Sequence, residues 1–117
     1  MTTLYGISNC DTVKKAMKWL TKQNITFTFH DFRKDGLDEG LLSSFVEQSD
    51  WSTLINKRST TFRNLPENLK SSLTGQQAVA TVLEQPTLLK RPLLVANKQL
   101  TVGFTDKTYL QLFEKND

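Results

Sequence analysis

The first thirty residues place a short apolar run, a polar turn, an amphipathic helix and a second β-rich run in succession. Residues 3–7 are typical of a buried strand that Ser8 and Asn9 end. Apolar residues then recur at helical spacing, with lysines at intervening positions. Alternation over residues 25–29 predicts a second strand. A strand, a helix and a strand in that order predict a right-handed crossover and a parallel pair, so the chain begins as an open α/β sheet.

The middle of the chain, about residues 37–86, favours helices over strands. Apolar residues at helical spacing predict an amphipathic helix over residues 37–46. A loop carrying Arg58 and Arg63 is expected to follow, and Thr74–Gln77 is a capping-box pattern ahead of a further helix. We therefore expect a helical insert between the second and third strands.

The chain returns to strands after the insert. Residues 93–96 and 99–102 are separated by Asn97-Lys98, two residues that suit a tight hairpin. A final helix is expected from about Thr105, and the residues on its buried face are Tyr109, Leu110 and Phe113. The predicted fold is α/β, a single domain over residues 1–117 with a mixed sheet of about four strands.

The composition narrows the classes of function. A chain with 38% hydrophobic and 23% charged residues is ordinary for a soluble globular domain. The formal charge of +3 is mild and the basic residues are spread along the chain, which predicts an anionic small molecule rather than a nucleic acid as partner. No apolar run suits a membrane span or a secretory signal, and a single cysteine excludes an internal disulfide. We expect a monomer in a reducing cytoplasm.

Cys10 is the only cysteine, and it falls where the first strand gives way to the first helix. Ser8 and Asp11 form an approximate capping box, with Asn9 as an alternative cap. The helix is therefore expected to begin at about Ser8 to Asn9, with Cys10 in its first turn. The amide groups of a first turn favour the thiolate, which is the nucleophilic form of cysteine. Cys10 is a candidate nucleophile, and the alternative is a small buried apolar residue.

Two arginines are candidate ligands for an anion, because guanidinium groups bind carboxylates and oxyanions through paired hydrogen bonds. Arg91 stands with Pro92 directly before the third strand, and Arg58 lies at the edge of the insert. The alternative for each arginine is a solvated surface charge, and for Pro92 an ordinary start of a strand. The only histidine, His30, has no evident metal-ligand partner in the sequence, so we expect no metal site.

Five stretches together resemble the arsenate reductase-related (ArsC/Spx) family, and most closely its YffB-like branch. The resemblance covers essentially the whole chain, and the first and fourth stretches are specific in combination. The five stretches are Leu4–Ala16, Phe29–Leu37, Asn56–Arg63, Lys90–Leu94 and Val102–Phe104.

The resemblance implies a thioredoxin-like core in which Cys10 is the redox nucleophile. Arg58 and Arg91 match two of the family's anion-binding arginines, and Asn9 and Pro92 complete the expected substrate- or glutathione-binding set. In a thioredoxin-like fold, the proline before the third strand is commonly cis and packs beside the active cysteine.

Two departures from the family's motifs shape the expected function. Gly103-Phe104 stand where glutaredoxin-coupled arsenate reductases carry a third arginine, and Val13 stands where Spx-type regulators carry the second cysteine of a Cys-x-x-Cys switch. The resemblance implies a glutathione-dependent monothiol reductase that binds glutathione or a small oxyanion and holds no cofactor, with glutathione or a glutaredoxin resolving the mixed disulfide. Two alternatives stay open, namely a glutaredoxin-coupled arsenate reductase and a non-catalytic Spx-like protein-binding regulator.

Overall fold

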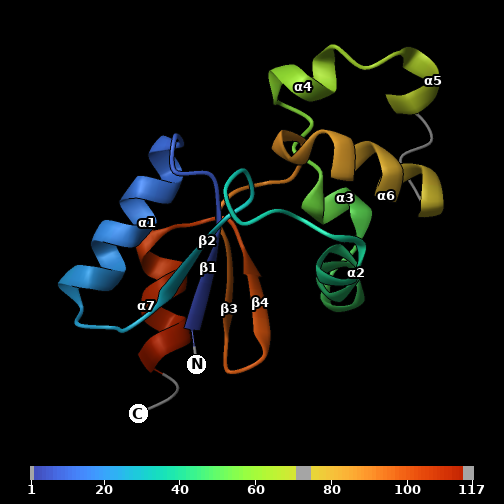
Figure 1. Ribbon diagram of the computed structural model, residues 1–117. Helices are drawn as coiled ribbons and strands as arrows, with labels where there is room; N and C mark the ends of the chain where they lie inside the picture. The colour runs from blue at the N-terminus through green and yellow to red at the C-terminus, as the bar shows by residue number, and fades with distance from the viewer. Residues whose placement is uncertain (1, 71–74, 115–117) are drawn as a thin grey trace. The chain divides into compact units, whose positions relative to one another are not determined.

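The computed structural model describes residues 2–70 and 75–114 (Figure 1). The chain divides into two compact units, one made of Met1–Lys34 with Arg91–Asp117 and the other of Asp35–Lys90. The capping-box pattern Thr74–Gln77 lies outside the residues whose side chains are described. Among the described residues, no helix has the length and apolar character that crossing a membrane requires.

The first unit is built on a four-stranded mixed sheet with the order β2-β1-β3-β4. Strand β1 (Thr2–Gly6) pairs in parallel with β2 (Thr28–Asp31) and antiparallel with β3 (Leu93–Ala96). Strand β4 (Gln99–Val102) pairs antiparallel with β3 at the edge. The predicted fold class, a thioredoxin-like mixed sheet with helices inserted between the second and third strands, is confirmed.

The turn between β3 and β4 has the backbone that the sequence predicts. Asn97 and Lys98 have φ angles of 51° and 67°, both in the left-handed region. Two such residues make a primed turn, whose twist matches that of the flanking strands. The hairpin boundaries predicted at residues 93–96 and 99–102 are confirmed.

The second strand begins later than the alternation over residues 25–29 predicts. Helix α1 (Asp11–Lys22) is followed by Asn24 with a φ of 60°, and the Ile25 N–H donates to the Leu20 carbonyl at 3.0 Å. These contacts keep the chain wrapped around the end of the helix. Pairing with β1 therefore starts only at Thr28, so the predicted start of the strand is wrong.

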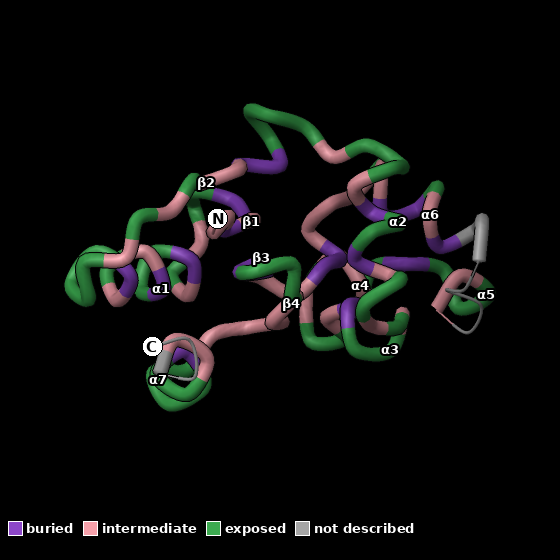
Figure 2. Tube along the Cα trace, turned by 90° about the horizontal axis from the view of Figure 1, so that it is seen from below, coloured by how far each residue is buried: buried purple, intermediate pink, exposed green. Residues whose placement is uncertain are grey.

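The core of the first unit lies between the sheet and two helices, α1 and α7 (Asp106–Glu114), which cover the same face in Figure 1. Six side chains in it are fully buried, and they are Leu4, Val13, Ala16, Leu20, Leu94 and Tyr109. Gly6 at the end of β1 allows the closest approach, because a Cβ there would lie 2.7 Å from a methyl carbon of Val13. Along α1, Figure 2 shows buried residues interleaved with exposed ones, as an amphipathic helix requires.

Helix α7 confirms two of the three residues predicted on its buried face. Tyr109 is fully buried and Phe113 is partly buried against the same cluster. The prediction that Leu110 is buried is wrong, because 49% of this residue is exposed. Tyr109 and Phe113 are four residues apart and share a face, whereas Leu110 is turned about 100° away from Tyr109.

The second unit is helical, as predicted, with a small apolar core of its own. Its elements are α2 (Glu39–Gln48), α3 (Trp51–Leu54), α4 (Thr60–Arg63), α5 (Glu67–Lys70), α6 (Gly75–Glu84) and the 3-10 helix η1 (Pro86–Leu88). Arg63 was expected in a loop, but it lies in α4. The Ser59 hydroxyl accepts a hydrogen bond from the Phe62 N–H at 3.1 Å and caps this short helix.

Replacing Tyr109 by phenylalanine tests the energetics of the core of the first unit. The Tyr109 hydroxyl is buried and has no hydrogen-bond partner among the described residues. We expect Tyr109→Phe to raise the free energy of unfolding by about 1 kcal/mol, because an unsatisfied buried polar group is removed while the ring contacts remain. Chemical denaturation at pH 7 measures this change.

The same variant predicts a change at alkaline pH. Burial raises the pKa of Tyr109 well above its ordinary value of about 10, so the unfolded chain loses this proton first. The folded state of the wild type therefore loses stability as the pH rises above about 10, because ionisation of this tyrosine then favours the unfolded chain. Tyr109→Phe should lose less stability above pH 10 than the wild type. An equal loss in both proteins would contradict the burial of this hydroxyl.

Candidate active site

The strand register brings distant parts of the sequence together at one edge of the sheet, namely the edge at which β1 ends and β3 begins. Tyr5, near the end of β1, pairs with His30 on one side and with Leu93 on the other. The chain that leaves β1 leads to Cys10, and the chain that enters β3 comes from Arg91 and Pro92. Cys10 and the Arg91-Pro92 pair therefore approach the same edge of the sheet in the same compact unit.

Cys10 is the residue that caps helix α1. Its φ and ψ angles of −131° and 124° are extended, and its carbonyl accepts the first helical bond from the Lys14 N–H at 3.0 Å. The predicted start of the helix at Ser8 or Asn9 is wrong, since the extended backbone of Cys10 places the first helical residue at Asp11. The Cys10 side chain makes no capping hydrogen bond.

The side chain of Cys10 is partly exposed and also packs against the core cluster of the first unit. It is therefore neither sealed inside packed hydrocarbon nor loose in solvent. The capping position faces the first amide groups of the helix, which have no partner within the helix itself. A sulfur held there can receive amide hydrogen bonds and the partial positive charge of the helix end.

A buried carboxylate, Asp31, ties the end of β2 to the loop that carries Cys10. It is 3% exposed and accepts hydrogen bonds from the backbone N–H of Ser8 at 3.3 Å and of Arg33 at 2.8 Å. The Phe32 N–H donates to the Gly6 carbonyl at 2.8 Å and adds a second link. Ser8 is two residues before Cys10, so Asp31 positions the loop that carries Cys10.

Hydrogen bonding holds Asp31 in its ionised form. Burial works to raise the pKa of Asp31, but hydrogen bonds from the backbone N–H groups of Arg33, Ser8 and Lys34 and from the Ser8 side chain outweigh it. The pKa of this carboxyl is consequently lower than its ordinary value. Sequence reasoning missed this role, although an acidic residue at the end of a strand parallel to β1 could have indicated it.

Arg91 and Pro92 form the opposite side of this edge. Arg91 is partly exposed, and its Nε atom is buried. The Arg91–Pro92 peptide bond is cis, as is common at this position in thioredoxin-like folds. Pro92 is buried and its carbonyl accepts a hydrogen bond from the Gly103 N–H at 2.8 Å. Direct packing of Pro92 on Cys10 stays a prediction.

Fewer contacts define the positions of the other two predicted ligands, Asn9 and Arg58. Asn9 is exposed in the loop directly before Cys10. Arg58 is exposed in the second unit, where its backbone N–H donates to the Asn56 side-chain oxygen at 3.1 Å. Asn9 thus belongs to the Cys10 loop by its position in the chain, whereas a role for Arg58 beside Cys10 stays a prediction.

His30 contributes to an aromatic cluster. Its ring centroid lies 5.1 Å from that of Tyr5 and 5.9 Å from that of Phe32. Within the described part of the chain, no group of histidine, cysteine, aspartate and glutamate side chains could hold a metal ion. These contacts give His30 a packing role on the sheet.

Comparison with known proteins identifies relatives over nearly the whole chain. The model of the ArsC family matches residues 5–112. An uncharacterized protein of Haemophilus influenzae is 49% identical over 97% of this chain and 99% of its own length. The regulatory protein MgsR of Bacillus subtilis is 34% identical over 97% of this chain and 90% of its own. Among solved structures, the YFFB (PA3664) protein superimposes with a TM-score of 0.88 at 37% identity, covering 95% of this chain and 97% of the other.

The Asp31→Asn variant tests the tie between β2 and the Cys10 loop. We expect it to lower the free energy of unfolding at pH 7 by about 1–2 kcal/mol, because hydrogen bonds to a charged acceptor are weakened. A lowered pKa gives stability that is present above the unfolded value of about 3.9 and is lost as the pH falls through the folded value. The difference between wild type and variant should therefore shrink below pH 4 in denaturation experiments.

The matched control is Glu47→Gln, which neutralises an exposed carboxylate on α2. It should change the stability by less than about 0.5 kcal/mol, as surface substitutions usually do. Equal effects of the two variants at pH 7 would argue that the hydrogen bonds of Asp31 do not hold the loop.

Proposed function

Because the chain belongs to the ArsC family, we propose that it is a glutathione-dependent monothiol reductase whose nucleophile is Cys10. One observation carries this proposal. The only cysteine of the chain is the N-cap residue of a helix and is partly exposed, at the sheet edge that Arg91 and Pro92 also approach. That combination suits a reactive thiolate beside a cationic ligand for an anion.

The charges near Cys10 in the sequence are of both signs. The end of α1 contributes the positive end of the helix dipole. Lys14 and Lys15 follow one turn later and add positive charge, whereas Asp11 stands next to Cys10 and adds a negative one.

The proposed reaction is a pair of thiol–disulfide exchanges. The Cys10 thiolate attacks the glutathione sulfur of a mixed disulfide, and that disulfide bond breaks as the bond between Cys10 and glutathione forms. The substrate sulfur leaves as a thiolate, which solvent protonates. A second glutathione thiolate then attacks the glutathione sulfur on Cys10, which releases glutathione disulfide and restores the Cys10 thiolate. A glutaredoxin thiol could take the place of the second glutathione, since the chain has no second cysteine.

The remaining residues of the proposed site bind and orient the glutathione. Glutathione has two carboxylates, and Arg91 and Arg58 supply guanidinium groups that suit them. Pro92 would shape the wall beside the sulfur, and Asn9 would offer side-chain amide hydrogen bonds next to Cys10. No resident cofactor or metal takes part, and a reducing compartment such as the cytoplasm would keep Cys10 in its reduced form.

A second candidate function is that of a protein-binding regulator, which the similarity to MgsR favours. In that case the surface of the protein, rather than the Cys10 chemistry, would carry the activity. Val13 leaves no partner for a disulfide with Cys10, so a switch through an internal disulfide does not apply. A Cys10→Ser strain that keeps the biological phenotype of the wild type would favour this function over the reductase. Arsenate reduction ranks lower, because Gly103-Phe104 supply no third arginine.

Treatment with glutathione disulfide tests the nucleophile directly. We expect intact-protein mass spectrometry to show a single glutathione adduct, because the chain has a single thiol and it is partly exposed. Cys10→Ser should give none, and added glutathione should remove the adduct from the wild type. An adduct that fails to form at neutral pH within the time that free cysteine needs would count against the proposed chemistry.

Substitution of Arg91 tests the anion site. We expect Arg91→Ala to lower kcat/KM for glutathione-dependent disulfide reduction by about 10- to 100-fold, mainly through KM, because a charge-assisted hydrogen bond is lost. Arg91→Lys should restore only part of this, since lysine cannot form the paired geometry. Arg63→Ala, at an exposed position of α4, is the control and should leave both constants near their wild-type values. If Arg91→Ala equals this control, Arg91 does not bind the substrate.

A further inference from the structure

Helix α1 carries the whole net charge of the chain. The sequence has 15 basic and 12 acidic side chains, which give a formal charge of +3. Four of the basic residues and one acidic residue belong to α1, so the helix alone carries +3 and the charges of the other residues cancel. The basic residues of the helix are Lys14, Lys15, Lys18 and Lys22, and the acidic residue is Asp11.

Three of these lysines form an unneutralised row. Lys14, Lys18 and Lys22 are four residues apart, so they follow one another along one side of the helix. All three are exposed, and none forms an ion pair with a carboxylate among residues 2–70 and 75–114. Like charges at this spacing repel one another and destabilise a helix. An anionic partner lying along the row would remove that repulsion.

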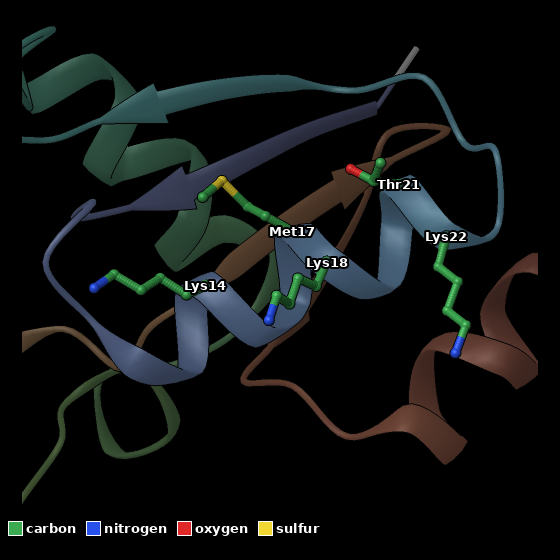
Figure 3. Close-up of a pocket in the computed structure, with 5 residues that line it drawn as sticks. All are labelled: Lys14, Met17, Lys18, Thr21 and Lys22. Atoms are coloured by element: carbon green, nitrogen blue, oxygen red, sulfur yellow. The ribbon is translucent and has the colours of Figure 1, made fainter.

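A shallow open groove of about 610 Å³ runs along the same helix (Figure 3). Two uncharged side chains, Met17 and Thr21, line it together with the three lysines of the row. In Figure 3, Lys18 and Lys22 project to one side of the helix, while Met17 and Thr21 project to the other. Met17 is partly exposed, and a thioether adapts its shape to different apolar partners.

A smaller groove of about 310 Å³ shares Lys18 and Lys22 with the first. It extends the same surface toward α7 with two aromatic rings, a third lysine and one carboxylate. Its additional lining residues are Lys15, Trp19, Phe104 and Asp106. Asp106 lines this groove and Asp11 belongs to the same helix as the lysines, so the lysines named here outnumber the named carboxylates.

We propose that the groove on α1 binds an acidic polypeptide segment, which belongs to the protein whose disulfide Cys10 attacks. The inference rests on the proposed function, in which Cys10 at the head of this helix is the nucleophile. A helix rises about 1.5 Å per residue, so the surface from Cys10 to Lys22 is roughly 18 Å long. An extended peptide covers this length with five or six residues, whereas the three residues of glutathione reach roughly 10 Å.

Other occupants fit this surface less well. A second copy of the chain would bring an identical row of lysines and be repelled by it. A nucleic acid would pair with the lysines through its phosphates but would make little use of Met17 beside them. An acidic peptide with an apolar residue among its carboxylates matches both the lysines and Met17.

The test uses a hexapeptide of one cysteine, four glutamates and one leucine, activated as its disulfide with thionitrobenzoate. The Cys10 thiolate attacks the peptide sulfur, the peptide–Cys10 disulfide forms, and the coloured thionitrobenzoate thiolate leaves. A second peptide with glutamines in place of the glutamates is the neutral control. We expect the acidic peptide to react with the wild type about tenfold faster than the neutral one at low salt, and this advantage to vanish at high salt.

Two variants of equal net charge locate the effect. Lys18→Glu reverses a charge that both grooves share, whereas Lys98→Glu reverses an exposed charge in the β3–β4 turn. We expect Lys18→Glu to slow the acidic peptide about fivefold without slowing the neutral peptide or glutathione disulfide, and Lys98→Glu to change none of the rates. Equal effects of the two variants, or an equal slowing of glutathione disulfide by Lys18→Glu, would overturn the proposal.

A binding measurement separates docking from chemistry. A fluorescent acidic peptide with serine in place of cysteine should bind to the Cys10→Ser protein and lose affinity about fivefold in the Cys10→Ser/Lys18→Glu protein. Binding without any reaction in the wild type would sink the reductase function and leave the docking surface standing. A single-stranded oligonucleotide of equal charge that binds more tightly than the peptide would instead make nucleic acid the partner and overturn the proposal.

Discussion

The close packing of α1 against the end of β1 determines where every other part of the site lies. Gly6 has no side chain, and this is what lets Val13 come so near to the strand. Strand β1 is itself fixed on both sides, by β2 and by β3. Only three residues, Ile7, Ser8 and Asn9, separate this strand from Cys10. With both the strand and the helix fixed by apolar packing, the short loop leaves the sulfur little freedom.

Polar contacts also hold the Cys10 loop in place. The carboxylate of Asp31 is buried, and a buried charge is tolerated only when hydrogen bonds compensate for the lost water. The amide groups that compensate it come from the Cys10 loop and from the turn after β2. The negative charge of Asp31 is thus compensated by these amides, and the chain segment that carries Arg91 approaches the same edge of the sheet.

The sequence predicted those features that depend on local patterns. Asn97 and Lys98 adopt the left-handed angles of a primed turn, and the apolar spacing of α1 and α7 placed Val13 and Tyr109 in the core. The start of β2 could not be read from its alternating residues, because the hydrogen bond from Ile25 back to Leu20 delays the strand. Tertiary contacts of this kind override a local preference for β structure.

The sequence named candidate residues for the site but not the contacts that hold them in place. Cys10 and Pro92 stand out by residue type and context, and the register of β1 with β3 brings their chain segments to one edge. The tie through Asp31 depends on the parallel register of β1 and β2, which no short motif encodes. The capping position of Cys10 likewise depends on one extended residue, which shifts the helix start away from the capping pattern at Ser8.

The two proposals assign chemistry to the end of helix α1 and recognition to its side. The amide groups at that end act only over the length of a hydrogen bond. The lysine row acts over a longer range, which ionic strength limits to about 10 Å. A monothiol enzyme gains from this division, because its mixed disulfide waits for an external thiol. A partner held along the helix raises the effective concentration of its own disulfide at Cys10.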